Sequence, residues 1–395
     1  MTREEVSNEI LNLDKKHLLT ILPTGYGKSK IALNYINKIN PEKVLIVIPL
    51  NTLISNWKQE IAKWGYNYNN IVFSTYRSLH KHIDTWDAVI FDECHHLSER
   101  AAESLEYIKA ERMIFLSATV KKEILYRLED IFFDLKVYKI RLREAINNEV
   151  LPDPIIILHK LQLGNDKSSF VIHPKVKGTM LQGNIKNYWY LNKIKSNPIT
   201  ITCTQKEHIE WLNSQINYWK NKFFMNNQPY MKNKWLQLCS ERLKVLSQFK
   251  EKIVKEQLNT TFKNVRTLTF CSSIAQTSFM GEYCLHSNNS KTINDDILES
   301  FNSGKINHTT ACAMLDEGQN LVNCQFGIYT NLSASDRLII QRLGRLLRHK
   351  NPYVYLPYFE NTRDEEIINK MTQDINSNNI ITYEKFNESK SIATT

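Results

Sequence analysis

Short apolar runs alternate with polar turns and amphipathic segments through the first 120 residues of the chain. The runs at 18–22, 44–48, 71–73, 88–91 and 113–116 have the length and composition of buried strands. Segments 29–39, 52–64 and 100–110 place apolar residues at helical spacing between these runs. Strands that alternate with helices in this way favour a parallel, doubly wound sheet with helices on both faces, which is an α/β fold.

The same alternation returns later in the chain, with strands expected at 267–270, 311–314, 327–330 and 354–356 and helices at 295–302 and 336–348. We therefore predict two α/β domains, formed by residues 1–150 and 151–375. Their boundary is placed at Pro152 and Pro154, because proline stops a helix. Residues 376–395 are polar and are predicted to be a frayed tail, apart from a short strand at 380–383.

The segment between the two α/β regions has a different character. From Lys160 to Thr260 it holds 17 Lys and Arg residues against 6 Asp and Glu. Apolar residues at helical spacing on either side of residues 226–229 predict a hairpin inside a mainly helical insertion at 186–260. The mixture of lysines and aromatic residues favours either a nucleic-acid contact or a structural insertion with buried aromatics. The candidate contacts are Lys220, Lys222, Lys232, Lys234 and Trp235.

Composition narrows the class of protein. The chain has 395 residues, 42% hydrophobic and 23% charged, as globular proteins do. Its formal net charge of +10 favours an anionic partner. No apolar run approaches the roughly 18 residues of a membrane span, and no signal-peptide core is present, so we expect a cytoplasmic protein without a membrane partner. The seven scattered cysteines argue against a zinc ribbon or a disulfide scaffold.

The strongest chemical signal is the sequence LPTGYGKS at residues 22–29, which lies between an expected strand and an expected helix. Small residues let backbone amides close around a phosphate, and the helix N-terminus and a lysine add positive potential. Lys28 would reach the β- and γ-phosphates and Ser29 would meet Mg²⁺, although Leu22 stands where the strict pattern has its first glycine. The expected nucleotide contacts are Pro23, Thr24, Gly25, Tyr26, Gly27, Lys28 and Ser29.

Two further groups carry the chemistry that a bound triphosphate needs. Asp92 and Glu93 follow an apolar strand, where Asp92 would hold Mg²⁺ and Glu93 would orient and deprotonate the attacking water. Arg345 and Arg348 lie three residues apart on an expected helix, so both guanidinium groups project from one face. Such arginines stabilise the charge that develops when a γ-phosphate is transferred.

Together these motifs resemble those of the superfamily 2 DExH-box helicases and translocases, with strongest likeness to phage UvsW-type helicases and the motor subunits of type III restriction enzymes. Further matches follow in the family's order. They are residues 49–57 for motif Ia, 74–79 for the TYxxL segment, 117–119 for motif III, 269–271 for motif IV, 316–320 for motif V and 341–348 for motif VI. The resemblance implies two RecA-like domains, with ATP and Mg²⁺ bound in the cleft between them.

The resemblance also implies roles for single residues. A further catalytic residue is expected at Gln341. Contacts to the nucleotide from motif V are expected at Gly318 and Asn320. Coupling of the ATP state to the second domain is expected at His95, Ser117 and Thr119. Contacts to nucleic acid, mostly to its phosphates, are expected at Thr52, Thr75 and Ser272.

Two positions depart from the family's pattern. Residues 1–21 contain no glutamine, whereas the family usually has one upstream of motif I that reads adenine. Hydrolysis of a nucleotide other than ATP therefore stays open. Asn320 stands where motif V commonly has an aspartate, which weakens a ribose or Mg²⁺ contact but keeps an amide hydrogen bond.

We thus expect an ATP-dependent DNA helicase or translocase, a monomeric motor of replication, recombination or repair that is encoded by a phage. Three alternatives remain: a motor subunit that works with a separate nuclease or replication factor, an RNA helicase, and an inactive nucleic-acid-binding module. DNA is favoured over RNA by the resemblance alone, because no residue pattern reads the 2′-hydroxyl. The motifs do not distinguish strand separation from translocation without unwinding.

Overall fold

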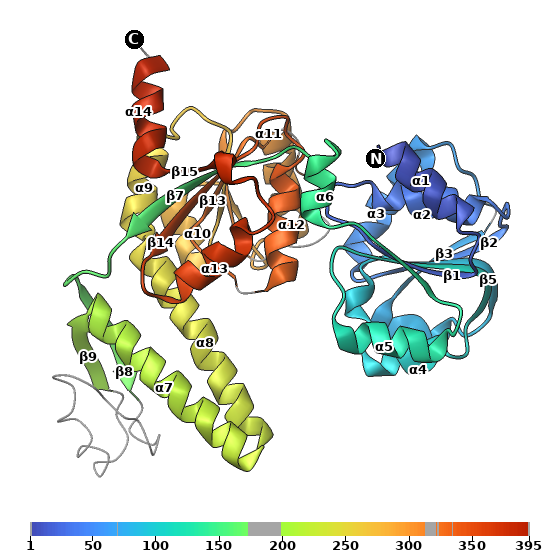
Figure 1. Cartoon of the computed structure of the whole chain (residues 1–395), viewed down its shortest axis with the longest axis horizontal. Coiled ribbons are helices and arrows are strands. Elements are labelled where there is room, and N and C mark those ends of the chain that lie inside the picture. The colour runs from blue at the N-terminus through green and yellow to red at the C-terminus, as the bar shows by residue number, and fades with distance from the viewer. Residues whose placement is uncertain are drawn as a thin grey trace.

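The computed structural model describes residues 2–68, 70–172, 199–312, 321, 324–333 and 335–393 (Figure 1). It contains a six-stranded sheet, a seven-stranded sheet and a separate two-stranded ribbon. Every pair of neighbouring strands in the two large sheets is parallel. The predicted α/β fold with two parallel-sheet domains is confirmed. Among the described residues, no helix combines the length and apolar character needed to cross a membrane.

The first domain is built on the six-stranded sheet, in the order β3-β2-β4-β5-β1-β6. Its strands are β1 (His17–Ile21), β2 (Lys43–Ile48), β3 (Asn70–Thr75), β4 (Thr85–Phe91), β5 (Lys109–Ser117) and β6 (Lys136–Lys139). One face is covered by α1 (Arg3–Asn12), α2 (Lys28–Asn37) and α3 (Ile54–Lys63), and the other by α4 (Glu99–Leu105) and α5 (Lys122–Ile131) (Figure 1). Short 3₁₀ helices η1 (Asn51–Leu53), η2 (Tyr76–Lys81) and η3 (Cys94–His96) follow β2, β3 and β4.

The register of the central strands brings their carboxyl ends to one edge of the sheet. Phe91 of β4 lies opposite Phe115 of β5, and Ile21 of β1 lies opposite Ser117 of β5. The segments that follow these strands carry the phosphate-binding sequence, the two carboxylates and motif III. In open parallel sheets, ligands bind at this edge.

One predicted helix is shorter than expected. The helix expected at 100–110 ends at Leu105, and Lys109 and Ala110 already belong to β5. The Lys109 amide donates to the Asp84 carbonyl at 3.2 Å, so pairing with the neighbouring strand outweighs the local helical pattern.

The chain crosses to the second domain after α6 (Leu142–Asn147). The seven-stranded sheet has the order β11-β12-β10-β13-β14-β7-β15. Its strands are β7 (Ile155–Leu161), β10 (Thr267–Phe270), β11 (Cys284–Leu285), β12 (His308–Ala311), β13 (Phe326–Tyr329), β14 (Tyr353–Phe359) and β15 (Ile380–Thr382). Its helices are α9 (Glu251–Asn259), α10 (Ile274–Met280), α11 (Lys291–Asn302), α12 (Asp336–Leu346), α13 (Arg363–Thr372) and α14 (Tyr383–Ala393), with the 3₁₀ helix η5 (Ser377–Asn379) before β15.

Residues 376–393 include the predicted short strand, which is β15, but they also form the helix α14 where a frayed tail was predicted. Ile380 pairs in parallel with Ile156, so β15 closes the edge of the second sheet. Phe386 of α14 is buried against Phe262 and Tyr353. The few apolar residues of this segment were too sparse to indicate packing, yet Ile381, Tyr383 and Phe386 belong to the apolar cluster that contains Val254 and Leu258 of α9.

The insertion contains an antiparallel ribbon, β8 (Lys167–Ile172) with β9 (Ile199–Thr204), and a hairpin of two long helices, α7 (Gln205–Asn226) and α8 (Pro229–Phe249). The hairpin projects from the second domain (Figure 1). Thr204 and Glu207 form a capping box at the start of α7, while Asn227 adopts the left-handed conformation and Pro229 begins α8. Residues 186–198 of the expected insertion lie outside the described residues.

Candidate functional site

The loop between β1 and α2 has the geometry of an anion cradle. Gly25 and Gly27 have φ angles of 89° and 97°, which side chains with a Cβ rarely adopt. Within the described chain, the backbone amides of Gly27, Lys28 and Ser29 donate to no other residue. Orphaned amides at a helix N-terminus are the donors that bind phosphate. The loop therefore fits the phosphates of a nucleotide.

Lys28 links this loop to the segment that follows β4. Its Nζ lies 3.3 Å from the Leu22 carbonyl oxygen and 3.7 Å from Glu93 Oε1. Arg3 of α1, which the sequence patterns did not reveal, donates to the carbonyl of Gly25 at 3.2 Å and so fixes the cradle from behind. The loop's own side chains Thr24 and Tyr26 bury oxygen atoms that have no hydrogen-bond partner.

Asp92 stands at the end of β4 and is held tightly. Trp57 Nε1 donates to its Oδ2 at 2.9 Å, and the Tyr76 hydroxyl donates to its carbonyl at 2.7 Å. Burial and, to a smaller extent, the neighbouring Glu93 carboxylate raise the pKa of Asp92 to about 6. The carboxylate of Asp92 and the hydroxyl of Ser29 are the hard oxygen ligands that Mg²⁺ prefers, so the donor set fits this ion.

Glu93 occupies a strained backbone position at the centre of the site. Its φ angle is 49°, in the left-handed region that is unfavourable for a residue with a side chain. Its Oε2 lies 3.2 Å from His95 Nδ1 and 3.4 Å from Ser117 Oγ, and these two side chains are 2.9 Å apart. Ser117 Oγ also donates to the Thr119 carbonyl at 2.8 Å. The structure thus gathers the three expected coupling residues around Glu93.

Motif VI approaches the phosphate cradle from the second domain. It forms α12, which lies on the side of that domain that faces the first (Figure 1). A Cβ built on Gly344 would lie only 2.3 Å from Thr24 Cβ. Gln341 is buried and its Oε1 has no partner, while Arg345 is also buried. The phosphate cradle of the first domain and motif VI of the second domain are therefore in contact.

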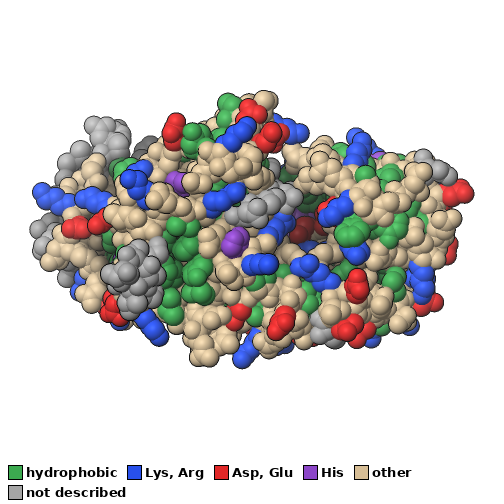
Figure 2. Space-filling model, turned by 90° about the horizontal axis from the view of Figure 1, so that it is seen from above, with side chains coloured by type: hydrophobic (Ala, Val, Ile, Leu, Met, Phe, Trp, Pro, Cys, Tyr) green, Lys and Arg blue, Asp and Glu red, His purple; other side chains and the backbone are tan. Residues whose placement is uncertain are grey.

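Arg348 and Arg342 have different surroundings. Arg348 lies at the end of motif VI and is partly exposed. Desolvation of its guanidinium group by the surrounding protein lowers its pKa, whereas the charge of Glu60 of α3 raises that pKa. Lys and Arg side chains gather around a hollow near the middle of the face shown in Figure 2. Arg342 instead donates to the Asn331 carbonyl at 3.0 Å and lies over the Phe270 ring at 5.1 Å. Both of these contacts lie within the second domain, so Arg342 stabilises that domain.

The expected nucleic-acid contacts occupy several places. Thr52 is exposed on η1 after β2, and Thr75 ends β3, with its Oγ1 donating to Ser78. Ser272 follows β10, and its hydroxyl donates to Gln276 at 3.0 Å. Thr52 and Thr75 share the sheet edge that holds Asp92, whereas Ser272 belongs to the second sheet. Gly318 and Asn320 of motif V lie outside the described residues.

The tip of the hairpin is aromatic, basic and exposed. Phe224 is 67% and Tyr230 58% exposed, and Met225 between them is 82% exposed. Lys222 Nζ lies 4.8 Å from the centre of the Tyr218 ring. The candidate contacts on these two helices are Lys220, Lys222, Lys232, Lys234 and Trp235, whose ring lies among those of Phe223 and Phe224.

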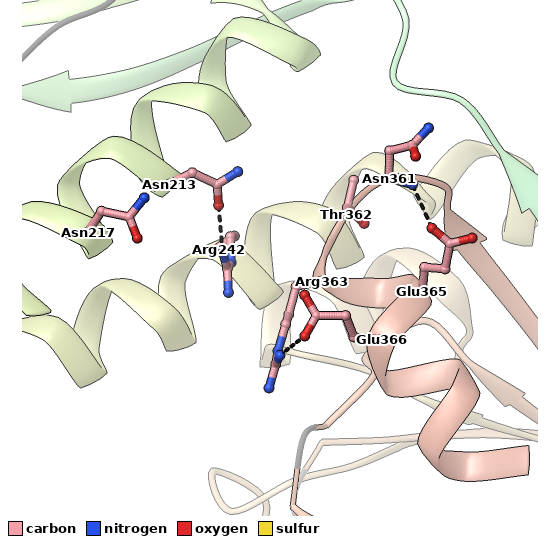
Figure 3. A pocket seen from close by; sticks show the side chains of 8 residues that line it. All are labelled: Asn213, Asn217, Arg242, Asn361, Thr362, Arg363, Glu365 and Glu366. Atoms are coloured by element: carbon pink, nitrogen blue, oxygen red, sulfur yellow. Dashed lines mark hydrogen bonds and ion pairs between the residues drawn. The ribbon is translucent and has the colours of Figure 1, made fainter. Parts of the chain in front are cut away.

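An open polar groove of about 400 Å³ separates the base of this hairpin from α13 (Figure 3). Arg242 donates to Asn213 at 2.5 Å, and Arg363 pairs with Glu366. The lining holds two arginines and two glutamates, so its formal charge is balanced. The lining residues are Asn213, Asn217, Arg242, Asn361, Thr362, Arg363, Glu365 and Glu366.

Two known families match parts of this chain. Residues 2–122 match the family described as type III restriction enzyme, res subunit, and residues 249–350 match the helicase conserved C-terminal domain. The first match contains the cradle and the Asp92–Glu93 pair, and the second contains α12.

Similar proteins point the same way. The DNA 3'-5' translocase XPB2 of Sulfurisphaera tokodaii is 24% identical over 388 residues, which is 92% of this chain and 80% of that protein. A putative helicase of Invertebrate iridescent virus 3 is 29% identical over 166 residues, or 35% of this chain and 50% of that protein.

Solved structures share the fold. The Hef helicase domain of Pyrococcus furiosus has a TM-score of 0.52 at 13% identity, with 93% of this chain and 96% of that chain covered. S. cerevisiae Dbp5 bound to RNA and ADP BeF3 has a TM-score of 0.60 at 11% identity, with 100% and 92% covered. The special likeness to UvsW-type helicases stays a prediction. The two matched families and the similar translocase support the assignment of this chain to the superfamily 2 helicases and translocases, which are ATP-hydrolysing enzymes.

Proposed function

We propose that this enzyme is a DNA helicase or translocase that couples ATP hydrolysis to movement along DNA or to its remodelling. The observation that carries the proposal is that the cradle contacts both Glu93, through Lys28, and α12 of the second domain, through Thr24. When a catalytic site is divided between two domains, hydrolysis of the bound nucleotide changes the contacts between those domains. Hydrolysis can thereby drive a movement of one domain relative to the other.

The residues of the first domain divide the chemical work. The amides of the cradle and Lys28 bind the phosphates, and Ser29 and Asp92 would hold Mg²⁺, which neutralises phosphate charge when bound. Glu93 orients the attacking water and accepts its proton at a carboxylate oxygen. His95 and Ser117 contact that same carboxylate, so a change in its protonation alters their contacts.

The second domain supplies positive charge and closes the site. Arg345 and Arg348 of motif VI stabilise the charge that develops on the transferred phosphoryl group, and Gln341 positions the water or the γ-phosphate. Gly318 and Asn320 add contacts to the nucleotide. An Arg348→Ala protein with wild-type ATP hydrolysis would contradict this assignment.

DNA is the proposed polymer because the similar archaeal protein is a DNA translocase and because the positive charge is concentrated in the insertion. Thr52, Thr75 and Ser272 would contact phosphates. The hairpin tip would attract the backbone through its lysines and stack exposed bases on its aromatic rings. We propose a monomeric motor of replication, recombination or repair, of phage or other viral origin, that works in the cytoplasm.

A second candidate is a motor subunit whose nuclease resides on another chain. The match of residues 2–122 to a restriction-enzyme subunit favours it. In the described part of this chain, no group of three or more His, Cys, Asp or Glu residues is arranged to hold a metal ion. In this second proposal, a partner protein supplies the nuclease activity.

The decisive experiment measures steady-state ATP hydrolysis by the wild type and Lys28→Ala, alone and with single-stranded DNA, branched duplex DNA or RNA. We expect DNA to stimulate the wild type and Lys28→Ala to lose the activity. Lys109→Ala, at an exposed lysine of β5, is the matched control and should behave as wild type. Stimulation by RNA alone would overturn the choice of DNA as the polymer. Hydrolysis at the same rate with and without every polymer would overturn the proposal that the enzyme is a nucleic-acid motor.

The hairpin contact needs its own experiment. Replacing Lys222 and Phe224 together by alanine should weaken binding of single-stranded DNA and make that binding less dependent on salt. Lys206→Ala, at the exposed start of α7, is the control on the same helix. Unchanged DNA affinity in the double variant would show that the hairpin is a structural insertion.

A further inference from the structure

Asp92 is held from three sides by elements that precede it in the chain. Its amide donates to the Val47 carbonyl of β2 at 2.8 Å. Its carboxylate accepts from Trp57 of α3, and its carbonyl accepts from Tyr76 at the start of η2. Side chain and backbone of this one residue are thus fixed by separate donors.

Trp57 and Trp86, the two buried tryptophans of this domain, use different hydrogen-bond acceptors. A buried indole N–H normally finds an acceptor, and a backbone carbonyl suffices. Trp86, equally buried, uses the His82 carbonyl at 3.2 Å. Trp57 instead donates to the carboxylate that would meet Mg²⁺, and a hydrogen bond to a charged group is stronger than one to a neutral group.

Trp57 and Tyr76 both belong to segments with an exposed polar surface. Thr52 lies on η1, which leads directly into α3, and it is exposed. Thr75 is the residue before Tyr76. Both threonines are proposed phosphate contacts, so each buried donor to Asp92 lies within five residues of a surface that would meet the polymer.

We propose that Trp57 and Tyr76 are positioning residues that link polymer binding at Thr52 and Thr75 to the orientation of the Asp92 carboxylate. Polymer bound on these segments holds α3 and η2 in place, and the two donors then hold Asp92 in the arrangement that receives Mg²⁺. Binding of the polymer therefore increases the affinity for Mg²⁺, and binding of Mg²⁺ increases the affinity for the polymer. The inference rests on the proposed function, since it takes nucleic acid as the occupant of the exposed surface.

The test compares Trp57→Phe and Tyr76→Phe with the wild type. Each change keeps an aromatic ring and removes one donor, and Trp86→Phe is the matched control because it removes a buried indole donor away from Asp92. The first measurement is the Mg²⁺ dependence of binding of a fluorescent ATP analogue without polymer. The second is ATP hydrolysis with and without single-stranded DNA, and thermal melting checks the fold of each variant.

We expect Trp57→Phe to raise the half-saturating Mg²⁺ concentration about tenfold, the size of effect given by one hydrogen bond to a charged group. The factor by which DNA stimulates hydrolysis should fall severalfold in Trp57→Phe and Tyr76→Phe, and Trp86→Phe should match the wild type. If Trp57→Phe fails to fold, Tyr76→Phe, which lacks only one oxygen atom, decides the result.

Two results would overturn the inference. One is an unchanged Mg²⁺ dependence and DNA stimulation in both variants. The other is an equal loss of hydrolysis with and without DNA, since this separates Asp92 from the polymer. A wild type without DNA stimulation would reject the proposed function instead, while the Mg²⁺ titration would still report whether Trp57 positions Asp92.

Discussion

Thr24 of the phosphate cradle and Gly344 of α12 are in contact across the two domains. A Cβ at position 344 would lie 2.3 Å from Thr24 Cβ and 3.1 Å from the Thr24 carbonyl oxygen. Neither atom can rotate away, because both are fixed to the backbone of the cradle. The absence of a side chain at Gly344 is therefore what lets motif VI reach the nucleotide site.

We predict that Gly344→Ala separates α12 from the cradle and lowers the kcat for ATP hydrolysis about tenfold or more. Overpacking of this kind costs roughly 1–3 kcal/mol, and each 1.36 kcal/mol corresponds to tenfold in rate. Gly164→Ala is the control, because the nearest atom to its added Cβ lies at 3.8 Å. Steady-state kinetics of both variants check the prediction, and a wild-type kcat in Gly344→Ala would contradict it.

Glu93→Gln should lower kcat by roughly 10²–10⁴-fold, the usual contribution of a general base. The amide keeps the size of the side chain and its place beside Ser117, so binding of a fluorescent ATP analogue should persist. Glu106→Gln, at an exposed site of the same domain, should leave both properties unchanged. Hydrolysis at the wild-type rate in Glu93→Gln would remove Glu93 from the catalytic role.

Lys250 and Asp364 form a fully buried ion pair, with Nζ and Oδ2 2.7 Å apart. Lys250→Met leaves the Asp364 carboxylate buried without its partner, which should lower the free energy of unfolding by about 3–5 kcal/mol. The double variant Lys250→Met/Asp364→Asn should regain much of that loss. Lys160→Met breaks an exposed pair with Glu360 and should cost under about 1 kcal/mol.

Urea unfolding of these variants measures the difference. Equal stability of Lys250→Met and Lys160→Met would show that the buried pair contributes no more than the exposed one. The comparison is matched, since each variant replaces a lysine of the second domain by the same apolar side chain.

His208 should make the insertion sensitive to acid. Burial lowers its pKa from 6.5 to about 4, and its ring stacks on Phe170 while Nδ1 lies 2.9 Å from Ser168 Oγ. The unfolded chain takes up a proton near pH 6.5 and the folded protein only near pH 4. The contribution of His208 to the free energy of unfolding is therefore fully present above pH 6.5. It is lost as the pH falls toward 4, and the loss reaches about 3 kcal/mol.

Urea unfolding at pH 7, 5.5 and 4.5 checks this dependence. His208→Gln should flatten the fall in stability over that range, because the glutamine does not titrate. His80→Gln, at an exposed histidine of the first domain, should fall with pH as the wild type does. A His208→Gln slope equal to that of the wild type would contradict the prediction.

The sequence predicted the elements with continuous local signals. The apolar runs gave β2 and β4 to within a few residues, and the two periodic segments around residues 226–229 gave the helical hairpin. The short strand expected at 380–383 is present as β15, but its place in the sheet depends on pairing with Ile156 and its neighbours, which the local sequence does not specify. The helix α14, which lies within the predicted frayed tail, was missed.

The sequence by itself determined the chemistry of the cradle. Residues 22–29 are contiguous, and their turn follows from two glycines with positive φ angles placed just before a helix. The family resemblance and the pair Asp92–Glu93 were likewise readable, because each motif is a short local pattern whose meaning depends on neighbours in the chain.

Only the tertiary structure decided which distant residues hold this chemistry in place. Trp57 reaches Asp92 because β2 and β4 are neighbours in the sheet, and Gly344 reaches Thr24 because α12 faces the first domain. The order of strands and the packing of domains come from the burial of apolar surface by the whole chain. An alternation of strands and helices is compatible with many such orders, so these contacts cannot be read from it.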